Sequence, residues 1–414
     1  MIHRILPVLA PTLLAGTGQG LAFAQLILLM TGTGAGHASD AYFYIIAWSQ
    51  VPWQVVLLGM LYPAWVRGSV IPRERLWLWS VPVMSVAAVI VSAWIFAHLA
   101  GSYEELPVHA VLLACLGAVT SLVWSSSLKL AALRKTNWLA AVTLPANLVS
   151  CLFLLVMRGE SQVFKVSGLL VGQILGMMVY LLLLVRARRA VSDVSSSLAS
   201  HGASNVTDRG GAHRWFLGQS VVGYGSILVI QSQIAALPAS SLSVTGMVSR
   251  VVSGISTAST NALLPRLVHA NADSPDPVFK FVRVVNLAGW IIFACGAVAV
   301  WRLDLRSTTF GYAIFVAPWL VAANLNASLK RLAARFLEPS VATFSILSAL
   351  VVPACLAVIG SLGGLSLKVV LLGLISMDLL PGVMLAAVFR QWGIMLSSLA
   401  CVGLAATVAT FMLS

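Results

Sequence analysis

Charged residues are scarce in this sequence. They make up 9% of its 414 residues, whereas a soluble domain carries roughly 25%. Acidic residues are the scarcest, with 12 Asp and Glu against 25 Lys and Arg. Hydrophobic residues account for 59%, and the mean hydropathy is +0.96. Such a composition leaves no stretch for a soluble enzymatic domain. We therefore expect a lipid bilayer to be the main solvent of this chain.

The residue patterns of several chemistries are also missing. The five cysteines all fall inside apolar segments, which speaks against a disulfide framework. The seven histidines show no HExxH or other metal-ligand spacing. The sequence also contains no Walker-type glycine motif, which would bind the phosphates of a nucleotide. We therefore predict a protein that is not an enzyme, that holds no metal or cofactor and that does not use ATP directly.

Long uncharged runs are present instead. A helix needs about 20 apolar residues to cross a hydrocarbon core, and no period-2 alternation typical of a membrane barrel occurs. We predict an all-α polytopic membrane protein with about 12–14 transmembrane helices. The thirteen candidate segments are 5–30, 41–66, 76–99, 108–128, 137–157, 166–185, 215–236, 242–265, 284–301, 307–329, 339–361, 369–389 and 391–413.

The distribution of Lys and Arg predicts the orientation. With the N-terminus in the cytoplasm, 19 of these residues lie on the inner side. Five lie outside: Arg158, Lys165, Arg302, Arg306 and Lys368. This bias is the positive-inside pattern of a multi-pass plasma-membrane protein. The net charge of +13 thus indicates topology and an affinity for anionic membrane lipids, and we expect no nucleic acid partner.

A polar stretch divides the chain. Residues 186–214 are rich in Ser, Ala, Gly and charge, so we predict a cytoplasmic linker there. It separates an N-terminal lobe of six helices, 1–185, from a C-terminal lobe of six, 215–390, which is followed by one additional helix at 391–414.

The two lobes begin alike. Segments 41–66 and 242–265 end in similar phrases, Gly59-Met-Leu-Tyr-Pro63 and Asn261-Ala-Leu-Leu-Pro265. We therefore predict two pseudo-symmetric bundles related by a parallel repeat, with substrate between the halves.

Two stretches resemble a known family. Gly20-Leu-Ala-Phe-Ala-Gln25, continuing to Gly32 and Asp40-Ala-Tyr-Phe43, is similar to the opening of the MurJ/MviN lipid II flippases. Met247-Val-Ser-Arg250 with Leu263-Leu-Pro-Arg-Leu267 resembles their eighth helix. These proteins are members of the multidrug/oligosaccharidyl-lipid/polysaccharide (MOP) exporter superfamily, which implies a MOP/MATE-like fold.

The resemblance implies a function. The protein would move a lipid-linked saccharide, of the undecaprenyl-phosphate-linked glycan or peptidoglycan-precursor type, across the inner membrane of a bacterium by alternating access. Cell-envelope biosynthesis proteins are then candidate partners.

The chain departs from the family at its cavity cations. Gln25 stands where the family has an arginine in the first helix, and Trp53-Gln54 stand where it often has an arginine pair. Arg250 remains, which puts lipid II itself in doubt. The predicted substrate-binding residues are Arg250, for a lipid phosphate, and Trp53, as part of a cavity wall. Gln25, Gln54 and Asn261 are predicted as well, because a sugar needs neutral hydrogen-bonding partners.

Three charged residues each have two open interpretations. Arg250 lies about nine residues, roughly 13 Å, inside its helix, where it would bind a lipid phosphate or form an ion pair with Asp378. Asp378 lies at a similar depth and would bind a coupling Na⁺ or proton, or neutralise Arg250. Asp40, at the outer end of the second helix, would close an external gate or be a solvated helix-start residue.

Other functions also stay open. The same fold would suit an ion-coupled small-molecule exporter, or a non-transporting membrane scaffold for cell-envelope synthesis, which the lost arginines permit. A glycosyltransferase or ligase is less favoured, since the one outer acidic pair, Glu104-Glu105, lies on a short loop.

Overall fold

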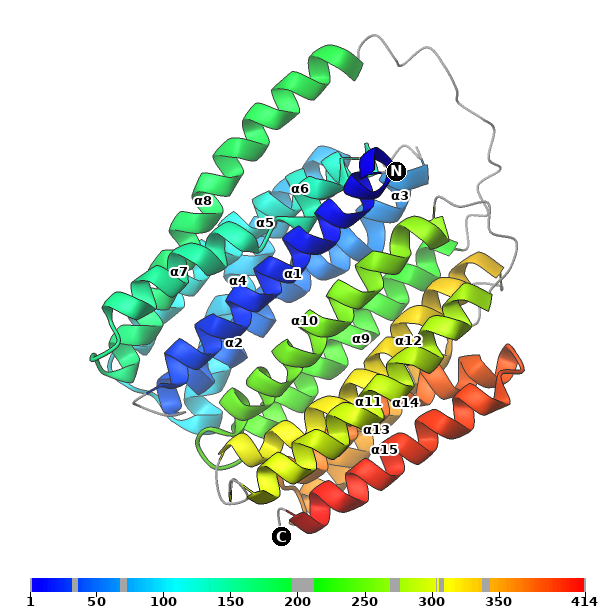
Figure 1. The fold of residues 1–414 in the computed structure, drawn as a ribbon. Helices are drawn as coiled ribbons and strands as arrows, with labels where there is room; N and C mark the ends of the chain where they lie inside the picture. The colour runs from blue at the N-terminus through cyan, green and yellow to red at the C-terminus, as the bar shows by residue number, and fades with distance from the viewer. Residues whose placement is uncertain are drawn as a thin grey trace. The chain divides into compact units, whose positions relative to one another are not determined.

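The structure, a computed structural model, describes residues 2–31, 36–67, 73–133, 135–195, 212–268, 276–302, 304, 309–336 and 343–412, and most of these residues are helical. No strand occurs in these ranges (Figure 1). The α-helices are α1 (Ile2–Met30), α2 (His37–Trp53), α3 (Tyr62–Arg67), α4 (Glu74–Ala100), α5 (Leu106–Ala132), α6 (Thr136–Ala140), α7 (Leu144–Val156), α8 (Gln162–Ser195), α9 (Ala212–Ala235), α10 (Ser241–Val268), α11 (Asp276–Arg302), α12 (Val316–Phe336), α13 (Thr343–Ser361), α14 (Leu367–Val388) and α15 (Trp392–Met412). A π-helix, η1 (Gln54–Leu61), and a 3₁₀-helix, η3 (Thr309–Phe315), complete the list.

Eleven candidate membrane spans occur in the described part of the chain, and each corresponds to a predicted segment. The other two predicted segments, 215–236 and 242–265, coincide with α9 and α10, which are long helices with many Ser, Gly and Gln residues. The prediction of an all-α polytopic membrane protein is confirmed.

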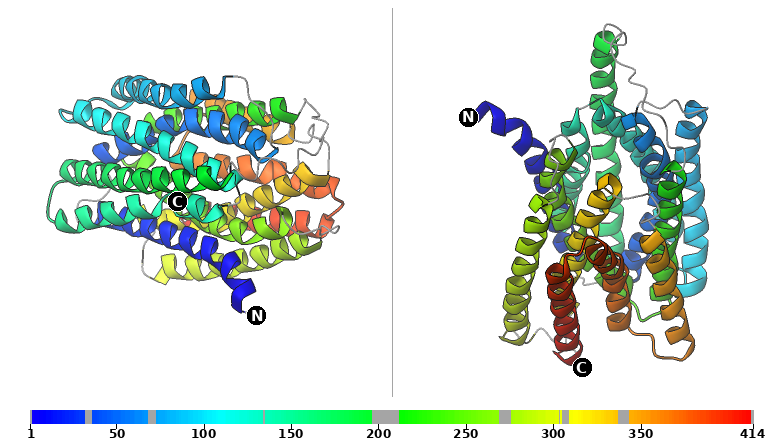
Figure 2. Two further views of the ribbon diagram at one scale, coloured as in Figure 1. Left: turned by 90° about the horizontal axis from the view of Figure 1, so that it is seen from above. Right: turned by 90° about the vertical axis from the view of Figure 1, so that its right-hand side faces the viewer.

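The chain forms two compact units, Met1–Leu228 and Val229–Ser414, here called unit 1 and unit 2. Within each unit the long helices run alongside one another (Figure 2). The predicted linker is in part helical, because α8 continues to Ser195 and α9 begins at Ala212. Residues 196–211 lie outside the described part, and the predicted lobe boundaries stay predictions.

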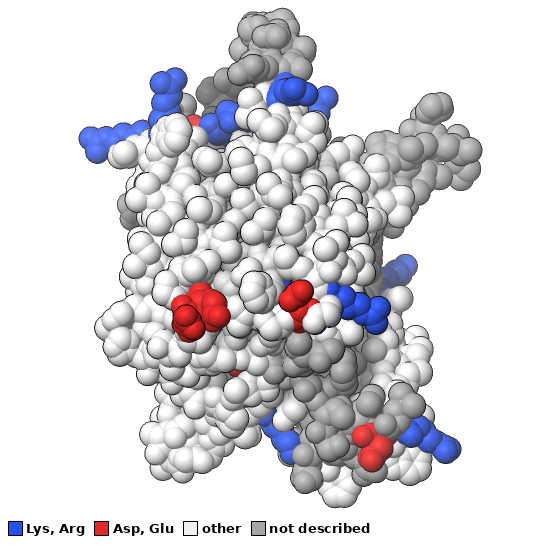
Figure 3. Space-filling model, turned by 90° about the vertical axis from the view of Figure 1, so that its left-hand side faces the viewer, with Lys and Arg blue, Asp and Glu red and all other residues white. Residues whose placement is uncertain are grey.

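The surface between the helix ends is largely uncharged. Figure 3 shows one face on which a broad uncharged band separates Lys and Arg at one edge from further charged side chains lower down. Large apolar side chains such as Trp94 on α4 and Leu182 on α8 are more than 60% exposed. Side chains of this kind are stable on a surface that lipid covers.

A stripe of glycines holds α8 against α7. Gly172 and Gly176 lie one turn apart on α8, where their backbone faces that of α7. A Cβ on Gly172 would lie 2.5 Å from the Cα of Ser150, and one on Gly176 would lie 2.5 Å from the Cα of Ala146. Small residues at this spacing let two helix backbones approach closely in a membrane.

The π-helix η1 aligns the core of unit 1. Its i→i+5 hydrogen bonds widen the turn, so that residues four apart fall close to one face. Trp53, Leu57 and Leu61 have this spacing, and all three are buried. They pack in one cluster with Val81 of α4 and Leu128 of α5. The local widening thus joins the second predicted span to its two neighbours.

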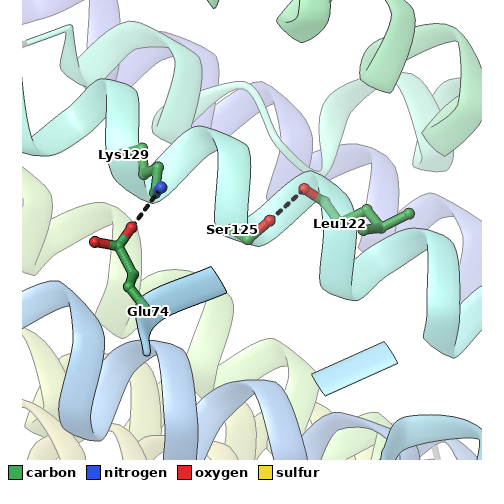
Figure 4. A network of polar contacts seen from close by, with 4 residues as sticks. All are labelled: Glu74, Leu122, Ser125 and Lys129. Carbon is green, nitrogen blue, oxygen red and sulfur yellow. Dashed lines mark hydrogen bonds and ion pairs between the residues drawn. The ribbon is translucent and has the colours of Figure 1, made fainter. Parts of the chain in front are cut away.

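An ion pair joins α5 to the start of α4. Lys129 Nζ lies 2.5 Å from a carboxylate oxygen of Glu74 and 5.2 Å from the ring centre of Trp65 on α3. Figure 4 shows the Lys129 and Glu74 side chains pointing toward each other. Because both side chains are partly exposed, we assign the pair at most about 1 kcal/mol. Lys129 thus contacts both the first residue of α4 and a ring of α3.

Candidate functional site

Asp378 on α14 is the centre of a polar site within unit 2. Trp319 and Asn326 of α12 both donate hydrogen bonds to its carboxylate. The indole Nε1 of Trp319 lies 3.0 Å from Oδ2, and Nδ2 of Asn326 lies 2.9 Å from Oδ1. Trp319 is 8% exposed and Asn326 is 7% exposed, so both donors are held in the interior of the unit. Two N–H donors stabilise an ionised carboxylate.

Helix geometry explains why these residues meet. Trp319 and Asn326 are seven residues apart, which places them two turns apart on one face of α12. Gly382 follows Asp378 by one turn on α14, and a Cβ there would lie 2.9 Å from the Leu325 side chain. The glycine therefore lets α14 approach α12 closely enough for Asp378 to accept both hydrogen bonds.

Lys330 is the nearest cation along α12 to this site. It follows Asn326 by one turn on α12, is half-buried and interacts electrostatically with Asp378. Sequence reasoning counted Lys330 among the inner-loop cations, whereas the structure places it within α12. The signal was present in the sequence, because Trp319, Asn326 and Lys330 recur at intervals of seven and four, as expected of one helix face.

Arg250 lies in the middle of α10 and is half-buried. Within the residues 241–256 whose side chains are described, it is the one charged residue of this helix. The hydroxyl of Ser253 donates to its backbone carbonyl at 3.2 Å. Its phosphate-binding role and its ion pair with Asp378 stay predictions.

Gln25 joins two helices of unit 1. The side chain is 1% exposed, and Nε2 donates to the hydroxyl of Ser150 on α7. Its Oε1 is buried and has no hydrogen-bond partner in the described structure. Close to it, Asn147 Nδ2 donates to the backbone carbonyl of Gly18 at 2.8 Å. Both amides thus hold α1 against α7, and a substrate contact of Gln25 stays a prediction.

Of the other predicted substrate residues, Trp53 and Gln54 are neighbours where α2 meets η1, and Asn261 belongs to α10. Trp53 is 5% exposed and stacks on Trp124 of α5 with ring centres 4.4 Å apart. Gln54 is half-buried and donates to Gln50 Oε1 at 3.4 Å. Asn261 lies in α10, and its side chain is outside the described residues. Their substrate contacts stay predictions.

Asp40 lies in the first turn of α2 and is 5% exposed. Beside it His37 donates from Nε2 to the carbonyl of Gly101 at 2.9 Å, and its ring contacts that of Tyr103. The predicted gate residue is therefore buried in unit 1 where α2 begins and α4 ends. Its gating role stays a prediction.

A hydrogen-bond chain that sequence reasoning missed lies at the same end of unit 1. Ser167 donates to the carbonyl of Val163, so His109 donates from Nε2 to Ser167 at 2.9 Å and accepts the Tyr103 hydroxyl at Nδ1 at 2.7 Å. Burial, and then the charge of Glu105, raise the pKa of Tyr103 above its usual value. The phenol therefore stays protonated and keeps donating to His109.

The Asp378 site offers a carboxylate held by two N–H donors. Among the residues that the structure describes, no three His, Cys, Asp or Glu side chains gather as a metal ion would require. What the Asp378 site can do chemically is hold a cation or a proton.

Comparison with known proteins identifies solved structures with a similar fold. No family model matches the sequence, and a search of curated proteins also found no match. Among solved structures, the chain is similar to lipid II flippase MurJ in its inward closed conformation, with a TM-score of 0.61 and 14% identity over 99% of this chain and 97% of that chain. It is also similar to the eukaryotic MATE transporter AtDTX14, with a TM-score of 0.50 and 11% identity over 96% of this chain and 97% of that chain.

The chain is thus a polytopic helical membrane protein, and the solved structures that it resembles are a flippase and a transporter. MurJ and the MATE transporters are both members of the MOP superfamily. The resemblance predicted from Gly20–Phe43 and Met247–Leu267 is therefore confirmed at the level of the fold.

Proposed function

We propose that this protein is a flippase that moves a lipid-linked saccharide across a bacterial plasma membrane by alternating access, with its N-terminus in the cytoplasm. The observation that carries the proposal is Arg250, a cation in the middle of a long helix of a MurJ-like fold. A cation at the centre of a membrane costs about 2.5–3.5 kcal/mol on insertion scales. A binding role for a lipid-linked phosphate offsets that cost.

The chemistry of arginine suits this substrate. Its planar guanidinium presents paired N–H donors that match two phosphate oxygens. A saccharide head group also needs side chains that accept hydrogen bonds from its hydroxyls. Gln231 and Gln233 of α9 each have a buried side-chain oxygen without a hydrogen-bond partner in the described structure. These acceptors support a head group that donates through hydroxyls.

An ion-coupled exporter of small molecules is the second candidate. It is favoured by the likeness to the MATE transporter AtDTX14, which covers 96% of this chain. In that case Asp378 would carry the coupling ion and Arg250 would be a structural residue. The two candidates differ in their cargo, so one transport assay separates them.

Arg250→Ala should strongly reduce translocation of undecaprenyl-linked saccharides while leaving the protein folded. The measurement is the protection of the lipid head group in inverted membrane vesicles that contain the wild type or the variant. We expect a loss of at least tenfold, because one charge-assisted bidentate contact to phosphate contributes about 1.5–3 kcal/mol. Arg250→Lys should recover part of the rate.

Arg302→Ala is the matched control, because Arg302 is an exposed arginine at the end of α11. It should translocate at the wild-type rate. If wild-type protein moves none of the lipid-linked saccharides of its host, the flippase is rejected. If Arg250→Ala and Arg302→Ala are equally active, Arg250 does not hold the substrate.

A further inference from the structure

His109 joins three parts of unit 1 at one end of its helices. It lies in the first turn of α5 and is 1% exposed. Its Nδ1 lies 2.7 Å from the hydroxyl of Tyr103, which belongs to the connection between α4 and α5, residues 101–105. Its Nε2 lies 2.9 Å from the hydroxyl of Ser167 on α8. The imidazole ring therefore ties this connection to α5 and α8.

The partners of His109 select its neutral form. The Ser167 hydroxyl donates its hydrogen to the carbonyl of Val163, so it accepts from Nε2. Nδ1 must then accept from the Tyr103 hydroxyl, because a neutral imidazole carries one N–H. A proton added at Nδ1 would turn this acceptor into a donor. The hydrogen bond from Tyr103 would be lost, and a charge would lie in a buried position.

A second histidine beside Tyr103 lacks this sensitivity. His37, the first residue of α2, has its ring centre 5.5 Å from that of Tyr103 and donates from Nε2 to the carbonyl of Gly101. A carbonyl oxygen only accepts, so this hydrogen bond persists when His37 is protonated. Both histidines hold the connection between α4 and α5, but acid breaks the contact that His109 makes.

Glu105 is the charged group that acts on this pair. It is the N-cap residue of α5, is half-buried and interacts electrostatically with both Tyr103 and His109. Of the charged residues on the neighbouring helices, Lys165 of α8 directs its ammonium group to the carbonyl that follows α1, and Asp40 is buried in the first turn of α2. The negative charge of Glu105 works against burial, so mild acid can place a proton on His109.

We propose that His109 is a pH-sensitive latch, which holds residues 101–105 against α5 and α8 through Tyr103 and Ser167 and releases them in acid. Its stabilising effect is present above a pH of about 6.5, the ordinary pKa of histidine, and is lost as the pH falls below it. In the orientation of the proposed function, this end of unit 1 faces the outside, so the latch would respond to external acid. That last step rests on the proposed function, whereas the latch itself does not.

Thermal unfolding of the purified protein at about pH 8 and about pH 5 tests the latch. The Tm of the wild type should be several degrees lower at the acidic pH. His109→Gln retains one donor and one acceptor but does not titrate, so its Tm should fall less. His98→Gln is the matched control, because His98 is an exposed histidine in the last turn of α4. Its Tm should fall as much as that of the wild type.

Tyr103→Phe identifies the hydrogen bond that depends on pH. It removes the hydroxyl alone, so it should lower the Tm at the higher pH, where the bond to His109 exists, and leave it unchanged at the lower pH. Tyr180→Phe is the control for this variant. It removes a hydroxyl that donates to the carbonyl of Trp138 and should lower the Tm equally at both pH values, because that acceptor does not titrate.

Three results overturn the proposal. The first is a wild type with the same Tm at both pH values. The second is a His109→Gln variant whose Tm falls in acid as steeply as that of the wild type. The third is a Tyr103→Phe variant that is destabilised equally at both pH values. Should His109→Gln fail to fold, Tyr103→Phe decides alone, since it leaves the imidazole in place. None of these measurements uses transport, so failure of the latch and failure of the flippase are distinguishable.

Discussion

Gly176→Ala should destabilise unit 1 by roughly 1–3 kcal/mol, the usual cost of adding a methyl group to a packed interior. The new Cβ would lie 2.5 Å from both the Cα of Ala146 and the carbonyl oxygen of Pro145. Both atoms belong to the backbone, so α7 and α8 would have to separate. Gly172→Ala should act in the same way against Ser150, and the double variant should not fold. Thermal unfolding of purified protein in detergent measures the effect.

Gly168→Ala is the matched control on the same helix. The atom that its Cβ would meet is the sulfur of Met157, at the far end of a flexible side chain. Methionine adapts its rotamers at little cost, so this variant should remain close to the wild type. If Gly176→Ala and Gly168→Ala were equally stable, backbone contact between α7 and α8 would not be the reason for the glycine spacing.

The glycine stripe is a sequence signal that the predictions above did not use. Gly168, Gly172 and Gly176 recur at a spacing of four, which indicates a close helix contact. The sequence does not name the partner, because Ala146 and Ser150 could lie on any neighbouring helix. Span positions, in contrast, follow from the length of an apolar run, a property of one stretch of chain. For that reason the predicted segments agree with the eleven spans of the structure.

The Asp378 site shows the limit of the same reasoning. The depth of Asp378 in its helix was predicted from the sequence, and its need for a partner follows from that depth. Its partners Trp319 and Asn326 lie more than 50 residues away along the chain, on another helix. Only the register between α12 and α14 decides which side chains meet. That register depends on the close approach at Gly382, a tertiary contact that a single sequence does not display.

The positive-inside argument also failed to predict where individual lysines lie. The positive-inside argument treats each Lys as a loop residue, and it placed Lys165 on the outer side and Lys330 on the inner side. In the structure both lie within helices, Lys165 in the first turn of α8 and Lys330 in α12. Lysine stems are long and apolar, so the ammonium group can reach a polar partner inside a unit.

Lys165→Ala should lower the free energy of unfolding of unit 1 by about 1.5–3 kcal/mol, the range for a hydrogen bond to a charged group. Lys165 is 0% exposed, and its Nζ donates to the backbone carbonyl of Thr31 at 2.6 Å. That carbonyl follows the last residue of α1, where the helix dipole favours a cation. One turn away, Gln162 Nε2 donates to the hydroxyl of Ser39 at 3.2 Å. The start of α8 therefore holds the end of α1 and the start of α2 together.

Two further variants separate the lost charge from the lost volume. Lys165→Met keeps most of the side chain but leaves the Thr31 carbonyl without its donor, so it should still be less stable than the wild type and more stable than Lys165→Ala. Arg158→Ala removes an exposed cation from the preceding turn and should stay within about 0.5 kcal/mol of the wild type. Thermal unfolding of the three variants provides the comparison. A Lys165→Met variant as stable as the wild type would mean that desolvation of the ammonium group costs as much as its hydrogen bond contributes, and the contact between α8 and α1 would then rest on apolar packing alone.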